Sequence, residues 1–551
     1  MLLKTNATEQ KLRGSYYTPK KLADFIVKLF IDDINNDKVK TILEPACGDG
    51  VFIKSIMENI NNNQIDKVTA VEIIEDEADK VTDLVKDYNK YEVINDDFIQ
   101  TYNLLLSQEP YDLILGNPPY IRYQYLTEKQ RQLQSEILVS HNMKSNKLIN
   151  AWVCFLVACV QLLSENGKIA FIIPAELLQV AYAEDLRLFL TNNLAKITIL
   201  AFEELVFDNI EQEVLVLIGE KNSNEAVENA IIGVKELKNL DCLSEFTMDE
   251  VEYRPIEHNK EKWTKYFIND NELDLVKAIR NNNKFVTFSD ISIVNVGITT
   301  GNNKYFSVSK DIVGEYELDN VVIPLIGRSS HAHGIYFTYE DWQVNVNKNK
   351  NAFLIKFPQD ISFEQYSEKH KGYIEKGEEE KENIGYKCQI RDRWYIVPSV
   401  WIPDAFFLRR NNTFPKFVIN NINAVSTDTM HRIKFNEGID KDKVLLSYYN
   451  SITFAFTEIN GRSYGGGVLE ILPGEVGKVI LPNLQEMDSI KVKELLGLVD
   501  NTIRNDLPID DLLDIIDREV LLNYLGIDRE ISLEFRNIWK KLMKRRHSRG
   551  K

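Results

Sequence analysis

The stretches TILEPACGDG (41–50) and YDLILGNPPY (111–120) open and close the part of the sequence that decides the fold. Between them, the strand-length apolar runs KVTAVEII (67–74) and YEVINDDF (91–98) flank the helix-length pattern EDEADKVTDLVKDY (75–88). Such alternation is typical of stacked β-α-β units. It predicts an α/β domain in which a mainly parallel sheet carries helices on both faces.

The alternation ends with KITILAFEE (196–204) and EQEVLVLIGE (211–220), which look like closing strands. After about residue 240 it gives way to shorter β-like pieces and longer loops. A chain of 551 residues is also too long for one ordinary core. We therefore predict an α/β domain over residues 1–240, a mixed α+β domain over 241–484, and a C-terminal helical region with a basic tail over 485–551.

The composition is that of a soluble globular protein, with 44% hydrophobic and 27% charged residues. Five cysteines without a C-x-x-C pair favour reduced thiols and a cytoplasmic location. The longest apolar segment, Ala151 to Leu163, is too short to span a bilayer, so we predict a buried helix and no membrane partner. His331 and His333 lack companions, which favours surface residues over a metal site.

The charge of the chain gives a mixed indication about nucleic acid. A net charge of −17 argues against a protein that coats nucleic acid without specificity. The end of the chain, WKKLMKRRHSRGK (539–551), contains no acidic residue. This segment is either a tail that seeks phosphate groups or a solubilising end, and the sequence leaves both interpretations open.

Unusual residues follow three successive predicted strands. They are Gly48, Gly50, Glu72, Asp96, Asp97 and Phe98. Ligands of an open parallel sheet bind at the carboxyl ends of its strands, where the glycines let the backbone approach a ligand. There Glu72 is placed to bind both hydroxyls of a ribose, and Asp97 to accept from an exocyclic amine beside the ring of Phe98. Solvated turn residues are the alternative for each acid alone, but the shared register directs all of them into one cleft.

The fourth predicted strand ends at Asn117, where two prolines stop the ladder and hold the backbone in one orientation. The side-chain oxygen of Asn117 and the carbonyl of Pro118 form two acceptors, which suit a planar amine that becomes tetrahedral as it attacks. Tyr120 adds a flat face for an aromatic ring. A plain Asn-Pro turn is the alternative, and the tyrosine and the acidic rim favour a functional site.

Together these segments resemble the motifs of a Rossmann-like, S-adenosylmethionine-dependent N6-adenine DNA methyltransferase. The segments are LEPACGDG (43–50), VEII (71–74), NDDF (95–98) and NPPY (117–120). GSYYTPKKLADFIV (14–27) resembles the family's N-terminal cofactor motif, and FEELVFDNIEQEVLVLIGE (202–220) resembles a segment that flanks the target base. The order of these motifs, with a long variable region last, is that of the gamma class of type II restriction-modification methylases.

The resemblance implies a role for each matching residue. The implied cofactor-binding residues are Tyr17, Thr18, Pro19, Glu44, Ala46, Gly48, Glu72, Ile73, Asp97, Phe98 and Asn117. The implied catalytic residues are Asn117, Pro118, Pro119 and Tyr120, and the residues implied to stack on the target base are Tyr120 and Phe207. For Phe207, a core aromatic residue at a strand end is the alternative. Cys47 follows Ala46 rather than proline, so no cysteine nucleophile of the cytosine C5 type is expected.

The expected function is methyl transfer to N6 of an adenine flipped out of double-stranded DNA. The alternatives transfer methyl to other nitrogens, namely cytosine N4, RNA guanine N2 or a protein glutamine. The long region after the first domain favours DNA, and Asn117 in place of serine argues against cytosine. Only thirteen residues precede Gly14, which argues against a fused nuclease domain, and the intact tetrapeptide argues against a noncatalytic DNA-binding subunit.

The second predicted domain is the expected reader of the DNA sequence. It mixes Asn, Ser, Gly and aromatic residues with arginines that phosphate anchoring and base reading require. The candidates are Arg391, Arg393, Arg409, Arg410 and Arg462, for which structural salt bridges are the open alternative. Expected partners are double-stranded DNA and a cognate restriction endonuclease that acts on the same site. We expect a monomer.

Overall fold

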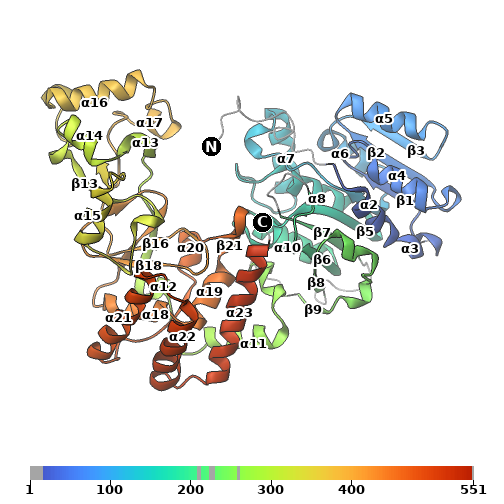
Figure 1. Cartoon of the computed structure of the whole chain (residues 1–551). Helices are drawn as coiled ribbons and strands as arrows, with labels where there is room; N and C mark the ends of the chain where they lie inside the picture. The colour runs from blue at the N-terminus through green and yellow to red at the C-terminus, as the bar shows by residue number, and fades with distance from the viewer. Residues whose placement is uncertain (1–16, 37, 208–212, 222–229, 257–260, 549–551) are drawn as a thin grey trace. The chain divides into compact units, whose positions relative to one another are not determined.

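The computed structural model describes residues 17–36, 38–207, 213–221, 230–256 and 261–548, and it divides into two compact units between Phe267 and Ile268 (Figure 1). The predicted boundary at residue 240 falls inside the first unit, because the strand Tyr253–Pro255 still pairs with the sheet of that unit. The structure therefore places the division later in the chain than the change in sequence pattern indicates.

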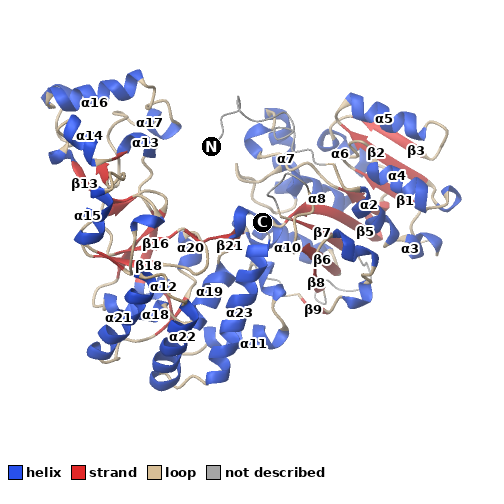
Figure 2. Ribbon diagram, viewed as in Figure 1, coloured by secondary structure: helices blue, strands red, loops and turns tan. Residues whose placement is uncertain are grey.

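The first unit is built on one nine-stranded sheet with the order β3-β2-β1-β4-β5-β7-β6-β8-β9 (Figure 2). Its strands are β1 (Thr41–Glu44), β2 (Lys67–Glu72), β3 (Tyr91–Asn95), β4 (Tyr111–Gly116), β5 (Leu163–Pro174), β6 (Lys196–Phe202), β7 (Val214–Glu220), β8 (Ile231–Leu237) and β9 (Tyr253–Pro255). Strands β1 to β5 are parallel, and β7 runs antiparallel to both β5 and β6. The predicted α/β fold is confirmed.

The strand order reverses between β1 and β4, because β2 and β3 lie on one side of β1 while β4 and β5 lie on the other. Such a reversal leaves a crevice outside the carboxyl ends of the strands. The ends of β1, β2, β3 and β4 are the positions that carry the predicted site residues. The topology thus brings four separate sequence segments to one edge.

The helices of the first unit connect these strands. They are α2 (Lys20–Lys28), α3 (Ile31–Asn35), α4 (Val51–Asn59), α5 (Glu75–Val85), α6 (Phe98–Leu106), α7 (Glu128–Ser140), α8 (Ala151–Leu162), α9 (Glu176–Gln179) and α10 (Glu184–Asn193). Helix α2 contacts α4, whereas α8 contacts α6, α7, α10 and β5. Apart from Gln161, every residue of α8 is buried, which confirms the predicted buried helix and explains its lack of a polar face.

The second unit contains the remaining strands and helices. Its strands form four sheets, with the orders β11-β20-β16-β18-β14, β12-β15-β13-β19, β17-β22-β21 and β10-β23. Its strands are β10 (Phe285–Thr287), β11 (Ser292–Val296), β12 (Ser307–Val308), β13 (Val322–Ile326), β14 (Tyr336–Phe337), β15 (Phe353–Ile355), β16 (Ala405–Leu408), β17 (Arg410–Asn411), β18 (Phe417–Asn420), β19 (Val425–Ser426), β20 (Met430–Phe435), β21 (Arg462–Tyr464), β22 (Val468–Glu470) and β23 (Ile480–Pro482). Its helices are α11 (Asp270–Arg280), α12 (Phe288–Ile291), α13 (Asn303–Phe306), α14 (Lys310–Glu315), α15 (Tyr339–Asn347), α16 (Glu368–Glu379), α17 (Tyr386–Gln389), α18 (Lys441–Tyr448), α19 (Ser451–Asn460), α20 (Pro473–Val476), α21 (Ser489–Arg504), α22 (Ile509–Ile516) and α23 (Arg529–Ser548).

The C-terminal helices do not form a separate part of the molecule. Val499, Leu513 and Trp539 belong to the same buried cluster as Phe407 and Phe454. The predicted region 485–551 therefore completes the core of the second unit as far as the structure describes it. Among the described residues, no helix is both long enough and apolar enough to cross a membrane.

As far as Ser548, the last described residue, the basic end of the chain is neither a free tail nor a purely solubilising segment. Arg546 is almost fully buried and forms an ion pair with Glu458 at 2.9 Å, with side-chain exposures of 3% and 2%. Its guanidinium also donates to the carbonyl of Gly467 at 2.5 Å. Lys540 pairs with Asp510 at 2.7 Å on the surface. These basic residues hold α23 on its own unit.

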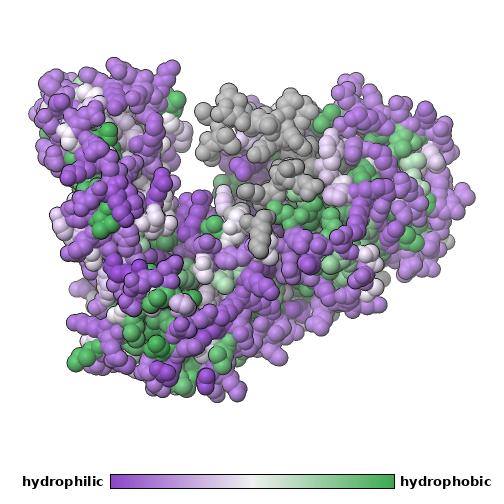
Figure 3. All heavy atoms as spheres, in the orientation of Figure 1, coloured by the Kyte–Doolittle hydropathy of each residue, from purple (hydrophilic) through white to green (hydrophobic). Residues whose placement is uncertain are grey.

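On the face that Figure 3 shows, hydrophilic residues cover most of the described surface, and hydrophobic residues are scattered among them. This agrees with the high charged fraction of 27%.

We expect Arg546→Ala to lower the free energy of unfolding of the second unit by about 3 to 5 kcal/mol, because Glu458 would remain buried without its partner. Lys540→Ala on the same helix breaks only an exposed pair and should cost less than about 1 kcal/mol. Denaturant unfolding of the two variants measures the difference. Equal losses for both variants would contradict the stabilising role of the buried pair.

Candidate cofactor and catalytic site

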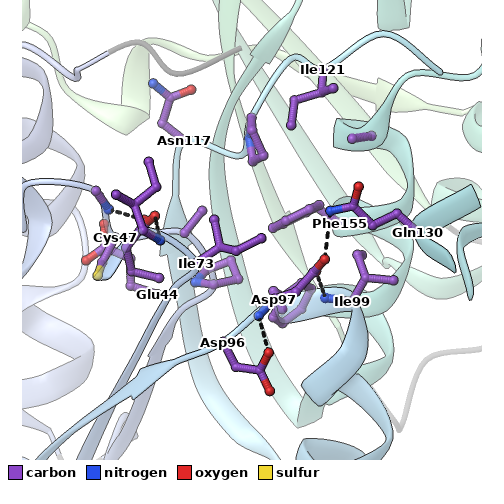
Figure 4. Close-up of a pocket in the computed structure, with 18 of the residues that line it drawn as sticks. Glu44, Cys47, Ile73, Asp96, Asp97, Ile99, Asn117, Ile121, Gln130 and Phe155 are labelled. Atoms are coloured by element: carbon purple, nitrogen blue, oxygen red, sulfur yellow. Dashed lines mark hydrogen bonds between the residues drawn. The ribbon is translucent and has the colours of Figure 1, made fainter. Parts of the chain in front are cut away.

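A cavity of about 530 Å³ lies at the carboxyl ends of β1 to β4 (Figure 4). The predicted residues that line it are Tyr17, Thr18, Glu44, Ala46, Gly48, Glu72, Ile73, Asp97, Phe98, Asn117 and Pro119. Pro19 and Pro118 belong to the same segments but are not among the lining residues. Predicted residues from five separate segments of the sequence therefore converge on one cavity.

The loop after β1 brings backbone to the wall of the cavity. Gly48 and Gly50 have positive φ angles of 51° and 76°. A Cβ on Gly50 would also come within 2.9 Å of Val81, so a larger residue is excluded there by both conformation and space. Gly50 is the N-terminal capping residue of α4, which directs the positive end of that helix toward this edge.

Glu72 ties the loops after β1 and β2 together. One of its carboxylate oxygens accepts from the backbone N–H of Gly48 at 2.8 Å, and the other accepts from that of Ile74 at 2.9 Å. Each oxygen has further acceptor capacity after these bonds. The carboxylate is therefore held rigidly and can still receive hydroxyl donors from a ligand.

Glu44 at the end of β1 is 1% exposed, and one of its oxygens has no hydrogen-bond partner among the described residues. Burial, reinforced by the carboxylates of Asp49 and Glu72, raises the pKa of Glu44 well above its usual range. A buried carboxylate with unused acceptor capacity is costly unless a donor or positive charge reaches it. In this cavity such a group would have to come from a ligand.

The chemistry of the lining fits the cofactor that the sequence resemblance implies. The described lining residues include five acids, Glu44, Asp49, Glu72, Asp96 and Asp97, and neither lysine nor arginine. S-adenosylmethionine carries a sulfonium and an ammonium group but no phosphate. A dinucleotide would instead require bare amides and positive charge around its pyrophosphate.

Asp97 lies across the cavity from Asn117 (Figure 4), and Phe98 also lines the cavity. One oxygen of Asp97 accepts from the backbone N–H of Ile99 at 2.9 Å and so caps α6. The other oxygen accepts from the side chain of Gln130 at 2.8 Å. The ring of Phe98 lies 4.9 Å from that of Phe155, between centroids, with 32° between their planes.

Gln130, Phe155, Leu126 and Tyr125 line the cavity but are absent from the predicted set. They follow the tetrapeptide in the segments around α7 and α8. The capping pattern TEKQ (127–130) is a recognisable helix start, and it was the one signal available for Gln130. Nothing in the sequence indicates that this helix start faces the acid after β3.

The tetrapeptide follows β4, which ends at Gly116 as the prolines predict. The Asn117 amide nitrogen donates to the hydroxyl of Thr18 at 3.2 Å, and Pro119 lines the cavity. Tyr120 is 9% exposed and is not among the lining residues. Its hydroxyl donates to the carbonyl of Ile172 at 3.1 Å. Asn117 and Thr18 thus meet at the cavity, while stacking by Tyr120 stays a prediction.

Phe207 is buried in the core of the first unit, and it too is not among the lining residues. The residues that follow it, 208–212, lie outside the described residues. Neither Phe207 nor Tyr120 is therefore among the residues that line the cavity. The stacking role of Phe207 also stays a prediction.

Cys47 lines the cavity, but it is poorly suited to act as a nucleophile. Burial, with the nearby carboxylates of Glu44 and Glu72, raises the pKa of its thiol. The thiolate is the reactive form of cysteine, and here it is strongly disfavoured at neutral pH. This agrees with the expectation of transfer without a covalent enzyme intermediate.

In the second unit, two of the five candidate arginines bind backbone carbonyls of their own unit. Arg391 donates to the carbonyl of Thr299 at 3.0 Å. Arg393 donates to the carbonyl of Ile361 at 2.6 Å. These bonds link loops to each other, so both side chains have a structural role.

Two further arginines form ion pairs. Arg409 pairs with Glu470 at 3.1 Å, and Arg462 pairs with Glu475 at 2.6 Å. Both acids are largely buried, so these pairs hold the sheet β17-β22-β21. The structural alternative that the sequence leaves open is realised for these residues.

Arg410 differs from the other four. Its side chain is 55% exposed, with only a long contact of 3.5 Å to Glu470. Its guanidinium lies 4.9 Å from the ring centroid of Tyr464, which is itself exposed. This cation–aromatic pair is available at the surface for a ligand.

His331 corrects an expectation, because it is buried rather than on the surface. Its ring nitrogen Nδ1 accepts from the backbone N–H of Gly327 at 3.3 Å. Burial lowers the pKa of His331 to about 4, so the ring is neutral at pH 7. Within the described part of the chain, no group of three or more His, Cys, Asp or Glu residues is arranged to hold a metal.

Two family models match the chain. Residues 14–207 match the model described as Eco57I restriction-modification methylase. Residues 260–521 match the model described as the C-terminal domain of the type II methyltransferase M.Eco57I. The first match lies within the first unit, and the second lies almost wholly within the second unit.

Individual relatives give a consistent picture. The chain is 27% identical to the type II methyltransferase M.AccI of Acinetobacter calcoaceticus over 508 residues, which cover 89% of each chain. It is 26% identical to the type II methyltransferase M.BanIII of Aneurinibacillus aneurinilyticus over 72% of this chain and 74% of the relative. It is 31% identical to the type II methyltransferase M.HincII of Haemophilus influenzae over 212 residues, or 38% of each chain.

Two solved structures share the fold. The type IIL restriction-modification enzyme MmeI in complex with DNA aligns with a TM-score of 0.60 and 13% identity, over 98% of this chain and 80% of that one. The DrdV–DNA complex aligns with a TM-score of 0.53 and 12% identity, over 89% of this chain and 58% of that one. At such identities the similarity concerns the fold alone.

We expect Glu44→Gln to raise the free energy of unfolding of the ligand-free protein at pH 8 by about 1 to 3 kcal/mol, the usual penalty of a buried acceptor without a donor. A carboxyl whose pKa is raised on folding contributes stability at low pH that is lost as the pH rises through the folded pKa. The advantage of the glutamine variant should therefore shrink toward pH 5.

Thermal unfolding of both proteins across this pH range measures the effect, with Glu75→Gln as an exposed control. A wild type that is as stable as Glu44→Gln at pH 8 would show that the Glu44 carboxylate finds a donor without ligand.

Proposed function

Because this chain belongs to the type II restriction-modification methylases, we propose that it transfers a methyl group from S-adenosylmethionine to N6 of an adenine in double-stranded DNA. The observation that carries this proposal is the meeting of Asn117 with an acid-lined cavity at the ends of β1 to β4. It would act at a specific site shared with a cognate restriction endonuclease, and as a monomer.

The cavity residues have separable roles in holding the cofactor. Glu44 would receive the ammonium end, Glu72 the ribose hydroxyls, and Asp97 the amine of the adenine ring, with Phe98 beside it. Gly48 lets backbone approach the ligand. When bound, S-adenosylmethionine supplies a methyl group on a cationic sulfur, which the surrounding carboxylates favour electrostatically.

Asn117 and Pro118 would grip the target amine. The side-chain oxygen of Asn117 and the carbonyl of Pro118 would each accept a hydrogen bond from one N–H of the target amine. The nitrogen lone pair is then released from conjugation with the ring as the amine becomes tetrahedral. This lone pair forms the new N–C bond while the S–C bond breaks and its electrons stay on sulfur. The surplus proton on nitrogen then leaves to water.

Thr18 supports this arrangement by fixing the amide of Asn117. The amide nitrogen donates to the Thr18 hydroxyl at 3.2 Å. In this orientation the amide oxygen is the end proposed for the target amine. Positioning of this kind supplies most of the rate in a direct displacement.

A base inside a duplex cannot reach this cavity, so the adenine must be rotated out of the stack at a cost of a few kcal/mol. Stacking on an aromatic ring is worth roughly 1 to 3 kcal/mol and would offset much of that cost. Tyr120 and Phe207 are the residues proposed for it. Because Tyr120 is bound to Ile172 through its hydroxyl, this role requires that its ring become accessible when DNA binds.

The second unit is the proposed reader of DNA, and Arg410 is its best-supported contact among the five arginines. Its guanidinium is exposed beside the ring of Tyr464. An arginine in this state can reach a phosphate or a base edge without breaking a buried bond. The other four arginines are bonded within the second unit, so no direct contact with DNA is proposed for them.

The direct test supplies purified protein with duplex DNA and S-adenosylmethionine labelled in its methyl group. Digestion of the DNA to nucleosides should place the label on N6-methyl-2′-deoxyadenosine. Label on N4 of cytosine would replace the proposed base, and label found only in RNA or protein would overturn the assignment to DNA.

We expect Asn117→Ala to abolish turnover and to leave DNA binding largely unchanged. Thr18→Val should lower kcat by about 10- to 100-fold, because a lost orienting hydrogen bond costs roughly 1.4 to 2.8 kcal/mol, and Thr18→Ser should restore most of it. Single-turnover kinetics measure these effects. Retained turnover in Asn117→Ala would refute its acceptor role, and an unchanged kcat in Thr18→Val would refute the orienting role of the hydroxyl.

We expect Arg410→Ala to weaken DNA binding by roughly tenfold and, for a phosphate contact, to reduce the slope of log affinity against log salt by about 1. Arg518→Ala is the control, because Arg518 is similarly exposed at 58% and pairs with Glu519. It should leave DNA binding unchanged, and titration of duplex DNA at several salt concentrations measures the affinity of both variants. Equal binding by wild type and Arg410→Ala would exclude this contact.

A further inference from the structure

Helix α7 brings one side chain from outside the family motifs into the acidic cavity. The side-chain nitrogen Nε2 of Gln130 donates to the oxygen Oδ2 of Asp97 at 2.8 Å. Figure 4 shows this bond reaching the carboxylate from the helix on the far side of the cavity from Asn117. A residue outside the predicted site therefore contacts the acid that is proposed to read the adenine ring of the cofactor.

The orientation of the Gln130 amide is fixed by its own helix. Its oxygen Oε1 accepts from both the backbone N–H and the hydroxyl of Thr127, at 3.0 and 3.1 Å. The hydroxyl of Thr127 in turn accepts from the backbone N–H of Gln130 at 3.2 Å, which completes a capping box. Rotation of the amide would lose these bonds, so its NH₂ group must face Asp97.

Asp97 is consequently held at both oxygens. Oδ1 accepts from the backbone N–H of Ile99 at 2.9 Å, and Oδ2 accepts from Gln130. A carboxylate has about four acceptor positions, so acceptor capacity is left, but the plane of the group is fixed. Both oxygens therefore serve as acceptors, so the group offers acceptors to a ligand in the cavity.

The surroundings make this arrangement selective. Asp97 is buried, and Phe98, Phe155 and Ile99 lie around it in the cavity wall. In such an environment a hydrogen bond is stronger than in water, and an acceptor that faces another acceptor is costly. A purine with an amine at C6 satisfies the fixed carboxylate, whereas a purine with an oxo group at C6 opposes it.

We propose that Gln130 is a positioning residue for selection of the cofactor's base: it locks Asp97 as an acceptor so that the site binds a 6-aminopurine and rejects a 6-oxopurine. The inference rests on the S-adenosylmethionine site of the proposed function, and it does not depend on which base of DNA is methylated. Gln130 touches the acid rather than the reacting atoms.

The test measures binding of two ligands by calorimetry, without turnover. S-adenosylhomocysteine carries the 6-amino group, and its deaminated form S-inosylhomocysteine carries the 6-oxo group. The wild type should prefer the amino ligand by about 100-fold or more, as sites that hydrogen-bond a ligand donor do. Gln130→Leu should weaken binding of the amino ligand by about tenfold and reduce the preference for it by at least about tenfold, because the carboxylate of Asp97 is then free to turn.

Gln132→Leu is the matched control, since Gln132 lies on the same helix but bonds to Glu136 at the surface. It should keep the wild-type preference. Gln130→Glu provides a second variant that does not depend on how leucine fits. Its carboxylate has no N–H to donate to Asp97, so binding of the amino ligand should weaken as it does in Gln130→Leu.

The outcomes separate this inference from the proposed function. A wild-type preference for the amino ligand that survives in both Gln130→Leu and Gln130→Glu would overturn the role of Gln130 alone. A wild type that binds neither ligand would overturn both the inference and the cofactor assignment. Normal ligand selection in a protein that methylates cytosine would leave the role of Gln130 standing and overturn only the target base.

Discussion

The convergence of carboxylates at the ends of β1, β2 and β3 is the constraint on which the rest of the first unit depends. Glu44, Glu72 and Asp97 are all buried at the wall of one cavity. Like charges so placed are tolerated only if donors reach them. The backbone of the glycine-rich loop, the start of α6 and the side chain of Gln130 supply such donors, and a cationic ligand would supply the remainder.

This requirement accounts for several local features together. The positive φ angles at Gly48 and Gly50 turn the loop toward Glu72, and the N-terminal cap of α6 uses the same acid that faces the ligand. The site is therefore built from the bonds that also end the strands and begin the helices. Buried charge recurs in the second unit, where Arg546 and Glu458 hold the last helix against a glycine-rich turn.

Sequence reasoning was effective wherever a residue's role follows from its place along the chain. The strands through β5, the buried helix α8 and the edge on which Glu72, Asp97 and Asn117 meet are all legible from hydrophobic period and strand ends. Long-range partners were not. The contact of Gln130 with Asp97 spans 33 residues, and the pairing of β8 with β9 moved the boundary of the unit past residue 240.

The surface residues show the same limit from the other direction. Composition alone made five arginines equal candidates for DNA, whereas the structure separates Arg410 from the four that bind carbonyls or buried acids. The sequence of the basic end likewise fits either a phosphate-binding tail or a solubilising end, whereas Arg546 is buried in the structure. Whether a charged side chain pairs within the protein depends on its neighbours in the tertiary structure, and no local sequence pattern indicates these.

The central claim is that the acid-lined cavity is the cofactor site, and a crystal structure with bound S-adenosylhomocysteine tests it most directly. The account predicts the ribose hydroxyls on Glu72, the adenine amine on Asp97 and the sulfur near Asn117. A ligand bound at any other place, or one whose adenine lies at Glu44 instead, would contradict it.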